Sequence, residues 1–160
     1  MSELRIGLGV DAHAFQDGVP LVLGGVVIAH PRGLAGHSDG DVIAHALTDA
    51  LLGAAGLADI GALFPSDDDR HRGADSVELL VEAYRQVGAA GYELVNADCV
   101  LIGEEPRIAP HREAMRSRLA AALGVGVDLV NVRATTTDRL GFTGRGEGLA
   151  AQAVALLRRV

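Results

Sequence analysis

The first predicted strand, Leu4–Val10, runs directly into Asp11 and His13. Side chains two residues apart on an extended strand leave the same face, so this carboxylate and this imidazole project together. A third candidate ligand, His45, lies in a helix predicted to follow the Gly-rich loop 31–40. One carboxylate and two imidazoles on two rigid elements suit a catalytic Zn²⁺ with an open fourth position. An isolated Asp-x-His pair is more often simply solvated, so the spacing alone leaves both interpretations open.

Length and composition predict one α/β domain over residues 1–160. The chain is long enough for one hydrophobic core and too short for two. Its residues are 49% hydrophobic but only 3% aromatic, so the core must be built from Ala, Val, Leu and Ile. The net charge of −7 argues against a nucleic-acid surface. An anionic substrate would therefore need metal ions, backbone N–H groups and a few Arg side chains.

Targeting signals and cysteine content predict a cytoplasmic protein with no membrane partner. The longest apolar run, residues 19–29, is too short to span a bilayer, and the N-terminus lacks the pattern of a signal peptide. The single cysteine, Cys99, excludes an internal disulfide and fits a reducing compartment. Because a free cysteine is usually a small buried hydrophobe, we expect Cys99 to be buried rather than to act as a nucleophile.

Turn residues and periodicity predict the other elements. Gly24-Gly25 would close a hairpin over residues 21–28, and two further strands are expected at 92–103 and 130–134. Capping residues and glycines indicate where four helices would begin and end. The first expected helix is capped by Ser38, with Asp41 three residues on, and ends at Gly56; the second is capped by Asp75, has a buried stripe that includes Val81, and ends at 88–91. A third is expected between Pro110 and Gly124. A fourth is expected at 147–158, and its inward residues would be Ala150, Ala151, Val154 and Leu157.

These elements predict a small mixed β-sheet with helices packed on one face, plus a β-hairpin. The other face of the sheet would then need a cover, and another subunit is the obvious one. Residues 59–72 contain Pro65 and no apolar periodicity, so they are expected to form a surface loop and a candidate lid. The acidic run 67–69 within this loop is interpreted as solvated charge.

Two polar segments could carry chemistry. His37 and Ser38 precede the first helix, where free N–H groups attract anions, but Ser38 could equally act only as a cap. The run 135–138 places three Thr residues and Asp138 after a strand. Hydroxyls there suit diphosphate oxygens and the acid suits Mg²⁺, although a Thr run often reflects only β-propensity.

Several long segments together resemble one enzyme family. They are DAHAF, GLAGHSDGDVIAHALTDALLGAAGLADIGALFP, GADS and ATTTDRLGFTGRGEGLAAQAVALL. In sequence order they resemble the 2-C-methyl-D-erythritol 2,4-cyclodiphosphate synthase family of the non-mevalonate isoprenoid pathway. The similarity runs from about Arg5 to the C-terminus. It implies a homotrimer that converts 4-diphosphocytidyl-2-C-methyl-D-erythritol 2-phosphate to the 2,4-cyclodiphosphate and releases CMP.

The resemblance also assigns roles to residues of this chain. Asp11, His13 and His45 would bind one Zn²⁺ per subunit, and His37 and Thr136 would stabilise the transition state. Asp138 would hold Mg²⁺ or Mn²⁺ on the diphosphate, but family members commonly carry the longer Glu here, which puts direct ligation in doubt. The substrate-binding residues would be Ser38, Asp59, Ile60, Gly61, Phe64, Pro65, Gly103, Pro106, Arg107, Ile108, Ala109, Ala134, Thr135, Thr137 and Asp138, with Phe142 and Arg145 near the three-fold axis, where an isoprenoid diphosphate could bind.

Two other functions stay open on the same residues. The first is a zinc phosphohydrolase in which metal-bound water attacks, with Asp41 as the nearest candidate base. The second is a trimeric small-molecule sensor with a structural metal. The remaining histidines, His30, His71 and His111, are expected to be ordinary surface residues.

Overall fold

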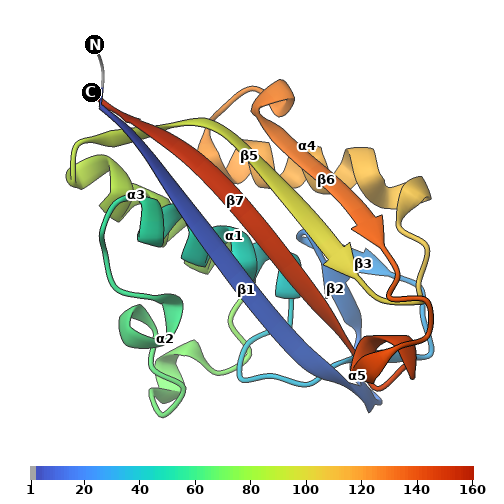
Figure 1. Cartoon of the computed structure of the whole chain (residues 1–160). Helices are drawn as coiled ribbons and strands as arrows, with labels where there is room; N and C mark the ends of the chain where they lie inside the picture. Colours follow the sequence, from blue (N-terminus) through green and yellow to red (C-terminus); the bar gives the residue numbers. More distant parts are fainter. Residues whose placement is uncertain (1–2) are drawn as a thin grey trace.

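The computed structural model describes residues 3–160 as one curved sheet with helices on one of its faces (Figure 1). Five strands are hydrogen-bonded in the order β4-β1-β7-β5-β6. All neighbours are antiparallel except β5 and β6, so the predicted mixed sheet is confirmed. The strands are β1 (Leu4–Asp17), β4 (Arg32–Leu34), β5 (Tyr92–Ile102), β6 (Val130–Thr135) and β7 (Gly148–Arg159).

The predicted hairpin forms a small sheet of its own, beside the main one. Its strands are β2 (Leu21–Leu23) and β3 (Val26–Ile28). Gly24 and Gly25 join them with φ angles of 59° and 74°, which a type I′ turn requires and which glycine adopts at little cost.

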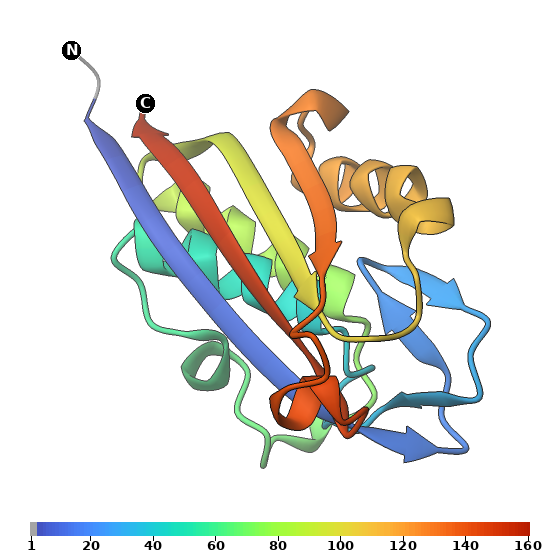
Figure 2. The ribbon, with the colours of Figure 1, turned by 45° about the vertical axis from the view of Figure 1, so that its right-hand side comes forward.

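Three longer helices cover one face of the main sheet (Figure 2). They are α1 (Val42–Ala54), α3 (Ser76–Ala89) and α4 (Arg112–Leu123). Asp75 caps α3 and left-handed Gly124 ends α4, as predicted, but Val81 on α3 is 46% exposed and not part of the buried stripe. The shorter helical segments are α2 (Ile60–Leu63), α5 (Gly141–Gly144) and the 3₁₀ turns Asp69–His71, Ala109–His111 and Val127–Leu129.

The predicted C-terminal helix is wrong, because residues 148–159 form β7, a central strand of the sheet. This strand pairs with β1 from Gly148 to Arg158 and with β5 on its other side. Alternation along the strand leaves Val154 41% exposed, whereas a helix would have turned it inward. The Ala-rich sequence favours a helix locally, but pairing with two neighbouring strands overrides that preference.

Helix α1 lies directly on β1 because glycines remove the side chains between them. A Cβ on Gly9 would be 1.8 Å from the carbonyl oxygen of Ala46, and one on Gly7 would be 2.0 Å from that of Ala50. The backbone of the helix therefore contacts the backbone of the strand. This close approach brings the side chains of β1 and α1 together at the site described below.

The core is built mainly from Ala, Val, Leu and Ile, as the composition predicts, with Tyr92, Cys99 and Met115 also buried in it. Cys99 is fully buried within it, and burial raises the pKa of its thiol to about 12, so it is not a nucleophile. The opposite face of β1 carries an apolar stripe that no element of the described chain covers. Its residues are Leu4, Ile6, Leu8 and Val10, which are between 56% and 73% exposed. Within residues 3–160, no helix has the length and apolar character needed to cross a membrane.

Candidate active site

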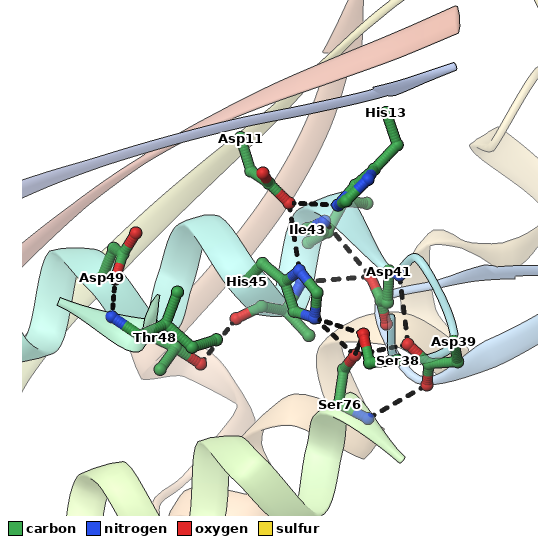
Figure 3. A network of polar contacts seen from close by, with 12 residues as sticks. Asp11, His13, Ser38, Asp39, Asp41, Ile43, His45, Thr48, Asp49 and Ser76 are labelled. Atoms are coloured by element: carbon green, nitrogen blue, oxygen red, sulfur yellow. Dashed lines mark hydrogen bonds and ion pairs between the residues drawn. The ribbon is translucent and has the colours of Figure 1, made fainter. Parts of the chain in front are cut away.

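The three predicted metal ligands converge between β1 and the first turn of α1 (Figure 3). Asp11 and His13 project from the middle of β1, which extends beyond its predicted end at Val10, and His45 projects from the first turn of α1. The Asp11 Oδ2 atom is 2.9 Å from His13 Nε2 and 3.1 Å from His45 Nδ1. One ligand atom from each residue lies within 4.8 Å of the other two.

The contacts of these atoms fit a bound cation. His13 Nε2 is buried and has no hydrogen-bond partner, because its approach to Asp11 lacks hydrogen-bond geometry. A buried ring nitrogen without a partner is costly unless something at the site binds it. Burial raises the pKa of Asp11, but its contacts with both histidines outweigh burial and hold that pKa at about 2. The carboxylate is therefore ionised and able to act as a ligand.

His45 contacts polar groups through both ring nitrogens. Its Nδ1 faces Asp11, and its Nε2 lies 2.9 Å from Ser38 Oγ and 2.7 Å from Ser76 Oγ. Burial lowers the pKa of His45, but the nearby carboxylates, Asp11 first among them, outweigh burial and raise it. Ser76 is fully buried and was not identified from the sequence; its only signal there is the GADS motif.

Ser38 does not cap α1, contrary to the prediction. Asp41 is the N-cap, and its side chain accepts hydrogen bonds from the N–H groups of Ile43 and Ala44. It also accepts from Gly24 and Gly25 of the hairpin turn. Burial raises the pKa of Asp41 to about 6. Because Asp41 is fully buried and its carboxylate accepts four N–H groups, it is poorly suited to act as a base at the metal position.

A cavity of about 130 Å³ opens beside the triad. A pocket this small holds only one part of a drug-sized ligand. Asp49 on α1 accepts a hydrogen bond from Ile60 N at 2.7 Å, which fixes α2 at the rim. The predicted lid is therefore partly ordered into α2 and a 3₁₀ turn. The lining includes His13, His37, Ser38, His45, Ile60, Gly61, Phe64, Ser66, His71 and Leu79.

Two histidines depart from the surface role predicted for them. His71 lines the cavity, with its ring 5.2 Å from that of Phe64. The side chain of His30 is only 8% exposed and stacks on Phe15. Because His71 comes from a segment without periodicity, no sequence signal indicates that it lines the cavity.

A second hollow lies at the ends of β5 and β6. One cavity of about 370 Å³ adjoins another of about 310 Å³. The first is lined by Gly103, Glu104, Pro106, Arg107, Ala134, Thr135 and Thr136, and the second by Arg107, Ile108, Ala109, Arg112, Arg133 and Ala134. The lining includes residues predicted to hold the nucleotide and the predicted catalytic Thr136, and it adds Glu104, Arg112 and Arg133, which were not among the predicted site residues.

The two hollows share no lining residue within the described chain. Strands β1 and β6 are separated by β7 and β5. At about 4.8 Å per strand, this places them roughly 14 Å apart. Within one chain, therefore, the metal triad and Thr136 are not brought together.

The loop after β6 holds the remaining predicted residues. Asp138 is exposed and has a φ of 51°, a left-handed conformation that Asp tolerates. Thr137 Oγ1 donates to Leu140 O at 2.7 Å, which gives this hydroxyl a local structural partner. Arg145 is paired with Glu147 at 2.7 Å, and Phe142 is 41% exposed.

Two further predicted residues are sequence neighbours of residues that line the first cavity. Asp59 caps α2 by accepting from Ala62 N at 2.8 Å, and its side chain is exposed. Pro65 follows Phe64 in the loop after α2. Neither residue itself lines that cavity, and the contact of both with the substrate stays a prediction.

The chain has a mixed sheet with helices on one face and three candidate metal ligands beside an open cavity. These features place it in the class of candidate metalloenzymes. The chain belongs to the YgbB family, whose model matches residues 4–158. The 2-C-methyl-D-erythritol 2,4-cyclodiphosphate synthase of Rubrobacter xylanophilus is 65% identical, covering 99% of this chain and 98% of its own. That of Moorella thermoacetica is 60% identical, covering 96% and 94%.

Solved structures have the same fold. A CDP-bound 2C-methyl-D-erythritol-2,4-cyclodiphosphate synthase has a TM-score of 0.87 at 43% identity, and the match covers 96% of this chain and 99% of that one. The bifunctional IspDF of Campylobacter jejuni has a TM-score of 0.96 at 45% identity. The match to IspDF covers 100% of this chain but only 43% of that longer protein.

Proposed function

We propose that this chain converts 4-diphosphocytidyl-2-C-methyl-D-erythritol 2-phosphate to 2-C-methyl-D-erythritol 2,4-cyclodiphosphate with release of CMP. The observation that carries the proposal is the convergence of Asp11, His13 and His45 beside a cavity lined by His37. The relatives that share almost the whole chain carry the name of this activity. By its chemistry the enzyme would be a phosphorus–oxygen lyase of isoprenoid precursor biosynthesis.

The reaction needs no side-chain nucleophile. An oxygen of the substrate's own 2-phosphate forms a bond to the β-phosphorus, and the bond from that phosphorus to the CMP oxygen breaks. Since both reacting groups belong to one molecule, the protein has only to fold the substrate and neutralise its charge. The ionised Asp11 and the two imidazoles suit Zn²⁺, and Mg²⁺ or Mn²⁺ would accompany the diphosphate. When bound, these cations would act as Lewis acids on the phosphate oxygens.

The side chains around the cavity would position the phosphates. His37 lines the cavity on the side of the triad, where its imidazole can donate to the transferring group. Thr136 would donate its hydroxyl from the other hollow, and Asp138 would hold the second cation. The nucleotide would lie in the hollow formed by 103–109 and 134–136, where main-chain groups can bind the cytosine base.

We propose a homotrimer with three composite active sites. Within one chain, the metal triad lies beside one cavity and Thr136 lines another. A substrate that contacts both would therefore need Thr136 from a second subunit. The apolar stripe on β1 supplies a surface for such contact. Phe142 and Arg145 would then lie near the three-fold axis, where an isoprenoid diphosphate could bind. We place the activity in the cytoplasm, which suits the one unpaired cysteine.

The hydrolase alternative is disfavoured because Asp41, its candidate base, is buried and fully hydrogen-bonded. Phosphorus NMR of the purified protein with the cytidyl substrate, Zn²⁺ and Mg²⁺ tests all three functions. A cyclic diphosphate and CMP are expected. A linear phosphate product would replace the proposal with the hydrolase, and an unchanged substrate that still binds would replace it with the sensor.

A further inference from the structure

A fully buried hydroxyl lies between His45 and an acid that no role above uses (Figure 3). Ser76, the first residue of α3, makes a short hydrogen bond through its Oγ to Asp39 Oδ1. The same Oγ atom is 2.7 Å from His45 Nε2. The Ser76 N–H donates to the other carboxylate oxygen, Oδ2, at 3.0 Å. Asp39 thus holds both the backbone and the hydroxyl of Ser76.

The positions of the protons follow from these contacts. An ionised carboxylate only accepts hydrogen bonds, so the Ser76 hydroxyl proton must point to Asp39. The Ser76 oxygen then has only lone pairs to offer His45. A neutral His45 that is hydrogen-bonded to Ser76 must therefore carry its proton on Nε2 and donate it to that oxygen, and the Ser38 hydroxyl beside the same Nε2 must then direct its own proton elsewhere, with Ser76 Oγ 3.3 Å away. This leaves the Nδ1 lone pair directed at the position beside Asp11 Oδ2, 3.1 Å away.

We propose that Asp39 and Ser76 are positioning residues that keep His45 in the Nε2–H tautomer and present its Nδ1 to the metal. A hydrogen bond from the second nitrogen of a metal-bound histidine fixes the ring and makes it a better ligand. Here the Ser76 hydroxyl accepts from the His45 ring and donates to the Asp39 carboxylate, so Asp39 acts on the ring through Ser76. The inference rests on the metal centre of the proposed function and extends it by two residues.

The pair also ties the loop before α1 to the start of α3. Asp39 Oδ1 accepts from Asp41 N at 3.1 Å, and Asp39 N donates to Ala74 O at 3.2 Å. These contacts hold Ser76, at the start of α3, in a set position relative to α1, the helix that carries His45. Ser38 provides a second partner: its hydroxyl is 2.9 Å from His45 Nε2 and 3.3 Å from Ser76 Oγ, but it makes no hydrogen bond to the Asp39 carboxylate.

The test compares four single variants for Zn²⁺ affinity, measured by chelator competition without any substrate. Ser76→Ala removes only the hydroxyl and keeps the N–H that binds Asp39. It should weaken Zn²⁺ binding about 10–100-fold. Asp39→Asn should also weaken it, because an amide has only one oxygen and cannot accept from both the N–H and the hydroxyl of Ser76 at the two positions that the carboxylate uses. Ser38→Ala should lose less, and Thr48→Val is the matched control, since its buried hydroxyl donates only to Ala44 O.

Nitrogen NMR of the histidine rings in the zinc-loaded protein gives a readout that a purely structural role would not change. The parent should show a proton on His45 Nε2, and Ser76→Ala should make that proton exchange faster with water. A proton on Nδ1 in the parent would overturn the inference, as would Ser76→Ala with the affinity of Thr48→Val. Neither measurement uses the substrate. The inference can therefore fail while the parent still forms the cyclic product, and it can hold if the product is linear.

Discussion

Replacing Gly9 by Ala tests whether the contact between β1 and α1 sets the metal geometry. A Cβ at this position would lie 1.8 Å from Ala46 O and 2.8 Å from Ala46 C and Ala50 N. All three are backbone atoms, so no side chain can rotate away. To restore an ordinary contact of about 3.4 Å, the helix must move outward by roughly 1.6 Å at Ala46, the residue next to His45.

Two effects of different size should result. Overpacking typically costs about 1–3 kcal/mol, which lowers the Tm of a domain of this size by roughly 3–10 °C. Metal–ligand distances tolerate only about 0.2 Å, so a shift of this size should separate His45 from Asp11 and His13 and weaken Zn²⁺ binding by more than tenfold. Thermal unfolding without metal measures the first effect, and chelator competition measures the second.

Gly53→Ala is the matched control, because Gly53 lies on the exposed side of α1 and a Cβ there meets nothing within 4 Å. It should leave Zn²⁺ affinity unchanged and raise stability by about 0.5–1 kcal/mol through helix propensity. If Gly9→Ala keeps both the parent Tm and the parent Zn²⁺ affinity, the backbone contact does not set the position of His45.

Three further predictions concern the proposed site. Asp11→Ala, His13→Ala and His45→Ala should each lose Zn²⁺ and turnover while circular dichroism stays near that of the parent; full metal occupancy in one variant removes that residue from the ligand set. Mixing the inactive His13→Ala and Thr136→Ala proteins should restore part of the activity if each site draws these residues from two subunits. Size-exclusion chromatography with light scattering should give the mass of a trimer. A monomer that still turns over would contradict both expectations. Asp138→Asn should need much more Mg²⁺ for half-maximal rate and lose roughly 10²-fold in turnover, whereas Asp138→Glu should be tolerated; an unchanged Mg²⁺ dependence would move the assignment to another acid.

The sequence predicted the elements whose pattern is local. Spacing and turn residues identified the strand that leads into Asp11 and His13 and the Gly24-Gly25 hairpin. They also identified the helices that end near Gly56 and Gly124. Local rules failed where two candidates satisfied them equally. Both Ser38 and Asp41 are good N-caps, and only the four N–H groups that converge on one carboxylate decide for Asp41.

The C-terminal segment shows why local patterns are not sufficient for a central strand. The run 148–157 is apolar at both helical and strand spacing, and its alanines favour a helix. Its pairing with β1 and β5 satisfies its backbone hydrogen bonds and leaves a surface of small side chains under α1. Neither partner is near it in the sequence, so no window of residues could contain this information.

The amino-acid sequence by itself indicated the candidate metal ligands, because Asp11 and His13 share one face of a strand, His45 starts a helix, and the family resemblance assigns all three. The tertiary structure decided how those ligands are held. It brought Ser76 and Asp39, residues 37 positions apart, onto the far side of His45. It also placed the metal triad and Thr136 on hollows that do not meet in one chain. Both results depend on which strands and helices become neighbours, and that depends on long-range pairing and packing.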